Sequence, residues 1–336
     1  FIEKNGLKPY TLCADDIRLL FQSPTLQTNG SIGISQNNDK LVWKTLFQML
    51  EARMSRGEFT VIDATNSKTI EINRYKEMAT TYRFRIICVD FTDIPIEQVK
   101  RQNAQRDELK RVPETVIDNM YSRFATQAIP SGVQIIKPNE LDKIWFAPFD
   151  LSKYKVVHHI GDIHGCNTVL QKYFEDNNGL KDDEMYIFTG DYIDRGIENS
   201  DVLNFLISIM DKPNVCLLEG NHEKHLWDWS NNCISRSKEF ELFTKKELEY
   251  NKLSKKSVRM LYRKLRQCAY YKYNDKLILV THGGISKIPN QILTVATEQM
   301  IKGVGDYNDY ETVNDEQTFI EEYSAIFSEL NKQKLI

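Results

Sequence analysis

Residues 184–196 read EMYIFTGDYIDRG, an apolar run that ends in a cluster of glycine, aspartate and arginine. The run Glu184–Thr189 has the length and apolar character of a buried β-strand. The glycines that flank the polar cluster allow the backbone to turn sharply there. The stretch therefore predicts an α/β domain in which Asp191 and Arg195 follow the carboxyl end of a strand.

Three further segments of the second half have the same arrangement, with polar residues directly after an apolar run. They are Gly161-Asp162-Ile163-His164-Gly165, Gly220-Asn221-His222-Glu223 and Thr281-His282-Gly283-Gly284. Ligands of open α/β sheets bind at the carboxyl ends of the strands, so we expect the four loops to converge on one site. Their Asp, His and Asn side chains suit a pair of divalent ions bridged by a carboxylate. One such segment alone is common in turns and helix caps, but four in this order are not readily produced by chance.

The four segments resemble the pattern of the calcineurin-like metallophosphoesterases, which is D-x-H, G-D-x-x-D-R-G, G-N-H-E/D and then H-G-G. The resemblance covers about residues 155–285. The metal ligands that it implies are Asp162 and His164 for one divalent ion, Asn221 and His282 for the other, and Asp191 as the bridge between them. Mn²⁺ is the ion that we expect.

The same resemblance implies a phosphoesterase reaction. Arg195 would hold phosphate oxygens, since its planar fork suits a phosphate at two points. His222 would lie beside the leaving-group oxygen as the general acid. Two ions about 3.5–4 Å apart lower the pKa of a bridging water and stabilise both the attacking and the departing oxygen.

The family pattern includes a further metal-binding histidine after H-G-G, and no histidine follows His282 in this sequence. Either the chain continues beyond Ile336 or the second metal site is weakened, and we favour a longer chain. His225 stands three residues after His222 and could be a substitute ligand, but a packed or surface histidine is the simpler interpretation.

The first half carries three weaker clusters. They are Asp15-Asp16-Ile17-Arg18, Asp63-Ala64-Thr65-Asn66, and Arg101-Gln102-Asn103-Ala104-Gln105-Arg106 followed by Val112-Pro113. A carboxylate and an arginine three residues apart share one face of a helix, where one can accept a hydroxyl proton and the other can bind phosphate. Taken singly, each cluster is better explained by helix capping or by a solvated surface.

Together and in this order, the three clusters resemble the polynucleotide 5′-kinase group of P-loop phosphotransferases. The resemblance implies that Asp15 is the general base on a 5′-hydroxyl and that Arg18 binds the substrate phosphate. Arg106 would be the lid arginine that stabilises the transferred phosphoryl group, with ATP and Mg²⁺ as cofactors. Thr65 and Asn66 would support the substrate site.

No G-x-x-x-x-G-K-[ST] segment occurs in this sequence, although that loop holds the β- and γ-phosphates in P-loop enzymes. The chain also begins with Phe1 rather than with methionine. We therefore expect that an upstream segment with the P-loop is missing from this sequence.

Apolar runs alternate with helical patterns along both halves, which predicts two α/β units with parallel sheets and crossover helices. The predicted strands are Tyr10–Cys13, Phe59–Ala64, Phe84–Phe91, Lys155–Ile160, Glu184–Thr189, Val215–Leu218 and Lys276–Thr281. The predicted helices are Lys40–Met54, Ile70–Tyr82, Ile96–Glu108, Thr168–Phe174 and Val202–Met210, with a charged helical insert over Ser235–Gln267. A chain of 336 residues has room for two domains of about 150 residues each. The irregular segment Lys137–Lys153 places them at 1–148, the P-loop kinase-like domain, and 149–336, the calcineurin-like domain.

Composition limits the surroundings and partners of the protein. The net charge of −3 gives no overall positive field, so contact with nucleic acid needs a local basic patch. The apolar stretches are far shorter than the ~18 residues that span a bilayer, so we expect no membrane contact. The six cysteines include no C-x-x-C pair and no signal peptide is visible, which is typical of reduced thiols in a cytoplasmic protein.

A polynucleotide-kinase-like domain joined to a calcineurin-like domain is the arrangement of bacterial and phage polynucleotide kinase-phosphatases. It predicts a 5′-hydroxyl kinase and a 3′-phosphatase or 2′,3′-cyclic phosphate phosphoesterase, which together repair RNA or DNA ends. A ligase module or a ligase partner would then join the repaired ends. One alternative is a metallophosphatase for dinucleoside polyphosphates or phosphoproteins, with a nucleotide-sensing N-terminal domain. The other is a degenerate protein that binds RNA ends or nucleotides without turnover.

Overall fold

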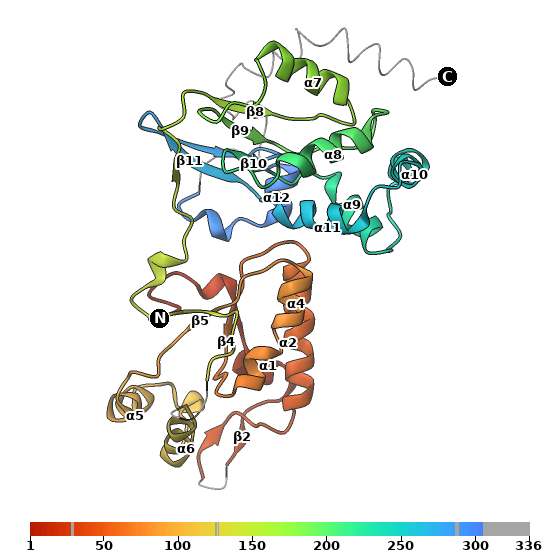
Figure 1. Ribbon diagram of the computed structural model, residues 1–336. Helices are drawn as coiled ribbons and strands as arrows, with labels where there is room; N and C mark the ends of the chain where they lie inside the picture. Colours follow the sequence, from red (N-terminus) through yellow and green to blue (C-terminus); the bar gives the residue numbers. More distant parts are fainter. Residues whose placement is uncertain (28–29, 125, 127, 286–288, 305–336) are drawn as a thin grey trace. The chain divides into compact units, whose positions relative to one another are not determined.

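The computed structural model describes residues 1–27, 30–124, 126, 128–285 and 289–304 (Figure 1). It divides the chain into two compact units, Phe1–Trp145 and Phe146–Ile336. Both units are mixed α/β structures with parallel strand pairs, as the alternation of strand and helix patterns predicts. Residues 305–336, the last part of the predicted phosphoesterase domain, lie outside the described residues. No helix in the described ranges is long and apolar enough to cross a membrane.

The N-terminal unit is built on short parallel strand pairs. The pairs are β1 (Thr11–Cys13) with β4 (Val61–Asp63) and β5 (Ile87–Val89) with β6 (Gln134–Ile136), and β2 (Thr25–Leu26) and β3 (Ile32–Gly33) form an antiparallel pair. The helices are α1 (Ala14–Phe21), α2 (Asp39–Met54), α3 (Thr69–Asn73), α4 (Lys76–Thr81), α5 (Ile96–Ala104) and α6 (Glu114–Phe124). Leu46 of α2 and Ile17 of α1 pack with Leu12 of β1 in its main apolar core.

The helix predicted over Ile70–Tyr82 is broken in the structure into α3 and α4. At the break, the Tyr75 ring packs on Phe47, with 5.5 Å between ring centroids, and its hydroxyl donates a hydrogen bond of 3.1 Å to Asn66 Oδ1. Burial raises the pKa of Tyr75 to about 12, so the phenol is neutral at physiological pH. A regular apolar periodicity does not reveal such a break, because the polar contact of Tyr75 is tertiary.

The C-terminal unit contains two sheets of three strands each. The first is parallel and has the order β10 (Val215–Leu217), β9 (Met185–Phe188), β8 (Val157–Ile160). The second has the order β12 (Lys276–Val280), β11 (Ala269–Tyr273), β7 (Phe149–Asp150). The helices are α7 (Asn167–Asp176), α8 (Asn199–Ile209), α9 (Glu223–Ser230), α10 (Lys245–Tyr250), α11 (Lys255–Lys264) and α12 (Thr297–Lys302).

The central strand β9 is buried on both faces, as its unbroken apolar run predicts. Tyr186 and Phe188 belong to a core that includes residues of α7, α8, α9 and α11. Met185 and Ile187 point into a second core, which includes Tyr271 of the other sheet. The first sheet is therefore covered by helices on one face and packed against the second sheet on the other.

The strand that precedes His282 does not belong to the parallel sheet. We expected all four site segments to follow strands of one open sheet, but β12 pairs antiparallel with β11 in the second sheet. Asn274 and Asp275 join β11 to β12 with φ values of 46° and 65°. Two successive positive φ values fit the tight hairpin turn that keeps the two strands adjacent.

The charged insert Ser235–Gln267 is helical, as predicted, and covers the core of this unit. It contains a π-helical turn at Phe240–Thr244 followed by α10 and α11. Phe240, Leu248 and Val258 are fully buried in the main core. The apolar residues of the insert thus pack inward, while most of its lysines and arginines stay at the surface.

Glu184 is a nearly buried carboxylate directly before β9. Its Oε2 lies 2.8 Å from His158 Nε2, and its Oε1 accepts a hydrogen bond of 3.0 Å from Lys181 Nζ. The other ring nitrogen of His158 lies 2.5 Å from the Tyr173 hydroxyl. Burial opposes ionisation of Glu184, but Lys181 and His158 outweigh it and hold the pKa of this carboxyl below its usual value.

Replacing Glu184 by glutamine is expected to lower the free energy of unfolding at neutral pH by about 2 kcal/mol, because the hydrogen bonds to a buried charge are lost. A depressed carboxyl pKa stabilises the fold above the unfolded pKa, and this contribution disappears as pH falls through the folded pKa. Urea unfolding should therefore separate wild type from E184Q at neutral pH and bring them together in acid. An equal difference at both pH values would contradict this, and E175Q on the exposed face of α7 serves as the control.

Candidate active site

The four predicted loops meet around the Asp191 carboxylate. His164 Nε2 lies 3.7 Å and His222 Nε2 3.8 Å from Asp191 Oδ2. On the other side, His282 Nε2 lies 3.4 Å from Asp191 Oδ1. Three of these residues follow strands of the parallel sheet and His282 follows β12, so both sheets of the unit contribute to the site.

Among the described residues, two groups of side chains are spaced to hold a metal ion. The first comprises His164, Asp191 and His222, and the second comprises Asp162, Asp191 and His282. Within each group, one ligand atom of each residue lies within 4.8 Å of the others. Asp191 is common to both groups, which is the arrangement expected of a bridging carboxylate. The grouping places His164 with His222 rather than with Asp162, with which it was paired by resemblance.

Two of the histidines are oriented by backbone carbonyls. His164 Nδ1 lies 2.9 Å from the Ile193 carbonyl oxygen, and His282 Nδ1 lies 2.9 Å from that of Thr189. A carbonyl only accepts, so each Nδ1 carries a proton and each Nε2 is the ring nitrogen that faces Asp191. Metal-binding histidines are commonly held in this way.

The site fits divalent metal ions. The Nε2 atom of His164 is buried and has no hydrogen-bond partner in the structure. A buried nitrogen with a free lone pair is costly unless a cation or a donor satisfies it. Burial also lowers the pKa of His164, which favours the neutral form that a metal ligand requires.

The charge of Asp191 is stabilised by its neighbours. Burial disfavours the ionised form, but His282 and His222 together hold the pKa of this carboxyl below its usual value. Burial likewise disfavours the protonated form of His282, yet the Asp191 carboxylate raises its pKa to about 9. Asp191 is thus negatively charged at neutral pH, as a bridging ligand must be.

The backbone of the site adopts conformations that most residues avoid. Asp162, His164 and Asp191 have φ values of 50°, 43° and 53°. Left-handed backbone at non-glycine residues clusters at functional sites, where the surrounding structure enforces it. Gly190 has φ 105°, and a Cβ atom there would lie 2.5 Å from the Gly220 backbone nitrogen. Only glycine allows the two loops to approach this closely.

His222 is held by a buried carboxylate on the side away from Asp191. Its Nδ1 lies 2.7 Å from Asp194 Oδ2, and the Thr244 hydroxyl donates to the other oxygen of Asp194. Asp194 is fully buried, and its backbone N–H donates a hydrogen bond of 2.8 Å to Asn199 Oδ1. The Asp194 hydrogen bond raises the pKa of His222, which favours the protonated, acid form.

Glu223 organises the backbone of the site, a role that the sequence motif does not reveal. It is fully buried, and its carboxylate accepts hydrogen bonds from the backbone N–H groups of Asp191, Tyr192 and Gly220 at 2.7–3.0 Å. Burial and the nearby Asp191 charge raise its pKa to about 7 despite these bonds. The side chain ties the loop after β9 to the loop after β10.

Glu223→Ala is expected to lower the free energy of unfolding by about 3 kcal/mol or more, because it leaves buried N–H groups without acceptors. Chemical denaturation measures this directly. Glu249 is an exposed residue of α10, and Glu249→Ala is the matched control, which should leave the free energy of unfolding almost unchanged. A Glu223 variant as stable as the control would show that these hydrogen bonds are replaced by water.

Asn221 and Arg195 lie at the exposed side of the site. Asn221 Oδ1 is 3.0 Å from His282 Nε2, so the amide lies beside the second metal-ligand group. Arg195 has φ 60°, and its backbone N–H donates a hydrogen bond of 2.8 Å to Glu239 of the insert. Glu239 thus fixes the backbone from which the exposed Arg195 side chain extends. His225, by contrast, lies 2.9 Å from the Ser235 hydroxyl and packs on Phe240.

The N-terminal unit brings together part of its predicted site. Asp15 and Arg18 share one face of α1, where Arg18 Nη1 lies 2.7 Å from Asp15 Oδ1. Arg18 Nε also donates a hydrogen bond of 2.9 Å to Asp39 Oδ1, so two carboxylates hold the buried guanidinium. Asp39, at the start of α2, is a partner that the sequence pattern did not reveal.

The other predicted residues of this unit come from neighbouring segments. Cys13 of β1 is in register with Asp63 of β4, so the residues after both strands, including Thr65 and Asn66, begin at one end of this pair. Arg106 follows α5, and its carbonyl accepts a hydrogen bond from the Arg111 side chain. The same connection reaches α1, because Lys110 Nζ lies 3.1 Å from Asp16 Oδ1.

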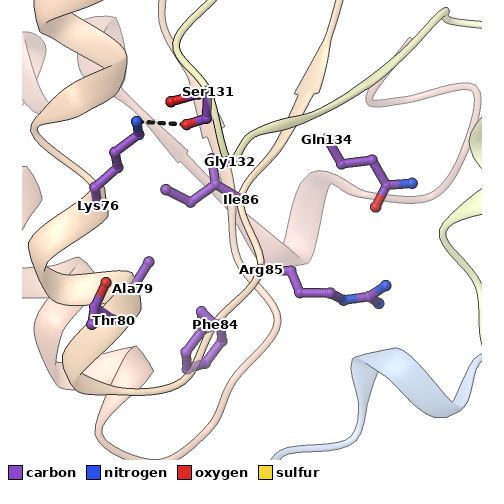
Figure 2. Close-up of a pocket in the computed structure, with 9 residues that line it drawn as sticks. All are labelled: Lys76, Ala79, Thr80, Phe84, Arg85, Ile86, Ser131, Gly132 and Gln134. Carbon is purple, nitrogen blue, oxygen red and sulfur yellow. Dashed lines mark hydrogen bonds between the residues drawn. The ribbon is translucent and has the colours of Figure 1, made fainter.

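A cavity of 480 Å³ in the N-terminal unit lies at another place (Figure 2). Its lining includes Phe84 and Arg85, which precede β5, and Gln134, which begins β6. Lys76 donates a hydrogen bond of 2.7 Å to the Ser131 carbonyl at its edge. None of the predicted phosphotransfer residues lines this cavity.

Comparison with known proteins places the two halves in separate families. The family model described as calcineurin-like phosphoesterase matches residues 155–334, and the model described as AAA domain matches residues 3–126. The chain therefore belongs to the calcineurin-like phosphoesterase family. It joins this phosphoesterase domain to an N-terminal domain of the P-loop class, which confirms the predicted domain combination.

The curated relatives that the chain resembles include phosphatases. "Serine/threonine-protein phosphatase 2" of Salmonella typhimurium is 35% identical over 83 residues, which are 25% of this chain and 36% of the relative. The symmetrical bis(5′-nucleosyl)-tetraphosphatase of Legionella pneumophila is 40% identical over 67 residues, which are 20% of this chain and 24% of the relative. The chain thus spans about a quarter to a third of the length of these relatives.

A solved structure entitled "Structure of the Pnkp1/Rnl/Hen1 RNA repair complex" is similar to a larger part of the chain. The similarity covers 75% of this chain and 83% of that chain, with 16% sequence identity and a TM-score of 0.29. A TM-score at this level is too low to support a functional argument.

Proposed function

We propose that this protein repairs nucleic-acid ends. The C-terminal domain would remove a 3′-phosphate or open and remove a 2′,3′-cyclic phosphate, and the N-terminal domain would phosphorylate a 5′-hydroxyl. The observation that carries the proposal is one chain that joins two groups of side chains spaced to hold metal ions around Asp191 to a P-loop-class domain with an acid–arginine pair on α1. Removal of phosphate from one end and its addition to the other produce the ends that a ligase joins.

In the phosphoesterase domain, Asp162, His164, Asp191, Asn221 and His282 would hold two divalent ions, for which we propose Mn²⁺. Such ions activate water as a nucleophile and neutralise charge on the phosphate oxygens. Asp191 keeps its charge through its contacts with the histidines, and the backbone carbonyls of Ile193 and Thr189 fix the ring nitrogens that face it.

His222 would donate a proton to the departing ribose oxygen. Its Nδ1 is held by Asp194, so the opposite nitrogen is the one that faces the site and carries the transferable proton. Asp194 stabilises the positive charge that the imidazole bears before transfer. Arg195 would bind two non-bridging phosphate oxygens, because its planar fork matches two of them.

In the N-terminal domain, Asp15 would accept the proton of the 5′-hydroxyl and Arg18 would bind the substrate phosphate. Arg106 would stabilise the transferred phosphoryl group of ATP, with Mg²⁺. Thr65 and Asn66 would support the substrate. Asp15 and Asp39 keep the Arg18 guanidinium in place when no substrate neutralises it.

A short RNA with a 3′-phosphate or a 2′,3′-cyclic phosphate, incubated with protein and Mn²⁺, tests the proposal. Release of inorganic phosphate supports it, and absence of release while a dinucleoside tetraphosphate is cleaved would overturn the substrate assignment. Transfer of labelled phosphate from ATP to a 5′-hydroxyl end tests the kinase reaction, and R18Q should abolish that transfer. Failure on every phosphoester would favour a protein that binds RNA ends or nucleotides without turnover.

A second candidate function is hydrolysis of dinucleoside polyphosphates or phosphoproteins. The sequence matches to a tetraphosphatase and to protein phosphatases favour it. In that case the N-terminal domain would sense nucleotides without catalysis. Comparing kcat/KM for RNA ends, a dinucleoside tetraphosphate and a phosphopeptide separates the two functions.

A further inference from the structure

Helix α11 carries a line of cations along α9. Its sequence, KKSVRMLYRK, contains five basic residues and no acidic residue, in a chain whose net charge is −3. Lys255, Arg259 and Arg263 are four residues apart, so they follow one another on the same side of the helix with a rise of about 6 Å each. Val258 and Leu261 bury the opposite side in the core.

Each of these three cations contacts a residue of α9. Lys255 Nζ lies 5.0 Å from the centroid of the Trp229 ring, and Arg263 Cζ lies 5.9 Å from that of Trp227. Arg259, which stands between these two cations on α11, donates to the Ser230 carbonyl. The cations are therefore held in a regular row rather than spread at random over the surface.

The row starts close to the proposed catalytic acid. α9 begins at Glu223, directly after His222, and Trp227 lies about 7 Å further along the helix axis. The ring of Trp227 is stacked on Tyr262, and the Tyr262 hydroxyl donates a hydrogen bond of 2.5 Å to Glu219, two residues before Asn221. Packing thus connects the row to the loop that carries Asn221 and His222.

The acidic residues around α11 include Asp211. Asp211 forms an ion pair of 2.8 Å with Lys264, so its charge is used by that lysine and not by the other cations of α11. Asp228 is a half-buried residue of α9. Lys256 is exposed and adds a fourth cation beside Arg259 and Arg263, so positive charge predominates along this side of α11.

We propose that Lys255, Lys256, Arg259 and Arg263, with Trp227, form a surface that binds the sugar-phosphate backbone of a single-stranded nucleic acid. This cationic surface would hold the strand whose 3′ end is processed beside His222. A row of cations with one charge per helical turn suits a ligand with regularly repeated phosphates, whereas a phosphopeptide offers one phosphate. The inference rests on the proposed function for its substrate, but binding is measurable without hydrolysis.

The test is fluorescence anisotropy with a labelled single-stranded RNA of about 12 nucleotides, a length in the range of single-strand sites, and the full chain in EDTA, so that no turnover occurs. K256Q/R263Q removes two exposed cations, and K238Q/K246Q removes two exposed lysines elsewhere on the insert as the matched control. Each phosphate contact contributes about 0.7 to the salt slope and a factor of about five at 0.1 M salt. We therefore expect K256Q/R263Q to bind about 25-fold more weakly with a slope lower by about 1.4, and the control to bind like wild type.

Trp227 supplies a second readout. RNA should change the tryptophan fluorescence of wild type, and W227F should lose most of that change.

Two results would overturn the proposal. One is RNA binding that is weakened equally in K256Q/R263Q and K238Q/K246Q, and the other is equal competition by polyaspartate and by unlabelled RNA. Hydrolysis of p-nitrophenyl phosphate with Mn²⁺ should be unchanged in K256Q/R263Q. If RNA binds here but no RNA end is hydrolysed, the surface stands and the proposed reaction fails; if RNA ends are hydrolysed and K256Q/R263Q binds normally, the reaction stands and the surface fails.

Discussion

Replacing Asp191 by alanine is expected to lower kcat/KM for a 3′-phosphorylated RNA by at least about a thousandfold. Asp191 belongs to both groups of side chains that are spaced to hold a metal ion, so its loss would remove the residue that the two groups share. Metal ions supply several kcal/mol of transition-state stabilisation, and each ~1.4 kcal/mol corresponds to a factor of about ten in rate. Phosphate release with Mn²⁺ measures the effect, and calorimetric titration with Mn²⁺ should show that ion binding is lost.

Asp176→Asn is the matched control for Asp191→Ala. Asp176 is exposed at the end of α7, and its carboxylate pairs with Lys172. This variant should retain the activity and the Mn²⁺ affinity of wild type. A D191A protein that is folded and still binds two ions per chain would contradict the assignment of Asp191 as the shared ligand.

Replacing His222 by glutamine is expected to reduce turnover of a 3′-phosphorylated RNA by about 10²–10⁴-fold, the usual contribution of a general acid. The same change should reduce hydrolysis of p-nitrophenyl phosphate by less than about tenfold, because nitrophenolate departs without a proton. The ratio of the two losses is the measurement. It separates proton donation from binding, because a defect in binding would affect both substrates.

His225→Gln is the control on the same helix, since the His225 ring packs on Phe240 outside both metal-ligand groups. It should leave the ratio unchanged. If H222Q lost the same factor on both substrates and bound Mn²⁺ more weakly, His222 would be a metal ligand together with His164 and Asp191. Asp194→Asn should reproduce the H222Q pattern in milder form, because the Asp194 carboxylate holds the His222 ring.

The elements of both units were largely predictable from local patterns. Strands β8, β9 and β10 lie within the predicted runs. β9 and β10 are short apolar segments, and β8 begins and ends with an apolar residue. Pairing was less predictable, because a single strand does not specify its neighbour. Nothing in residues 276–281 shows that β12 pairs with β11, which is rich in tyrosine and lacks the simple apolar run that identified the other strands. The break at Tyr75 was not predictable for the same reason, since Tyr75 contacts Phe47 and Asn66, which belong to other segments.

The residues that meet at the site were predictable, and the residues that hold them in place were not. Aspartate, histidine and asparagine after successive strands point to metal ligands by their chemistry. Glu223, Asp194 and Asp39 act through hydrogen bonds to backbone or to another side chain, and these contacts form only in the fold. A partial signal was present, because Asp194 and Glu223 are carboxylates inside the motifs that have no assigned ligand role.

The position of His282 on the second sheet has a consequence for folding. The loops after β8, β9 and β10 belong to the parallel sheet, whereas His282 reaches Asp191 only while the β11–β12 hairpin is packed against that sheet. A ligand that binds only the docked state stabilises it by mass action. Mn²⁺ should therefore act as a crosslink between the sheets, and amide hydrogen exchange of β11 and β12 should slow as the ion is added.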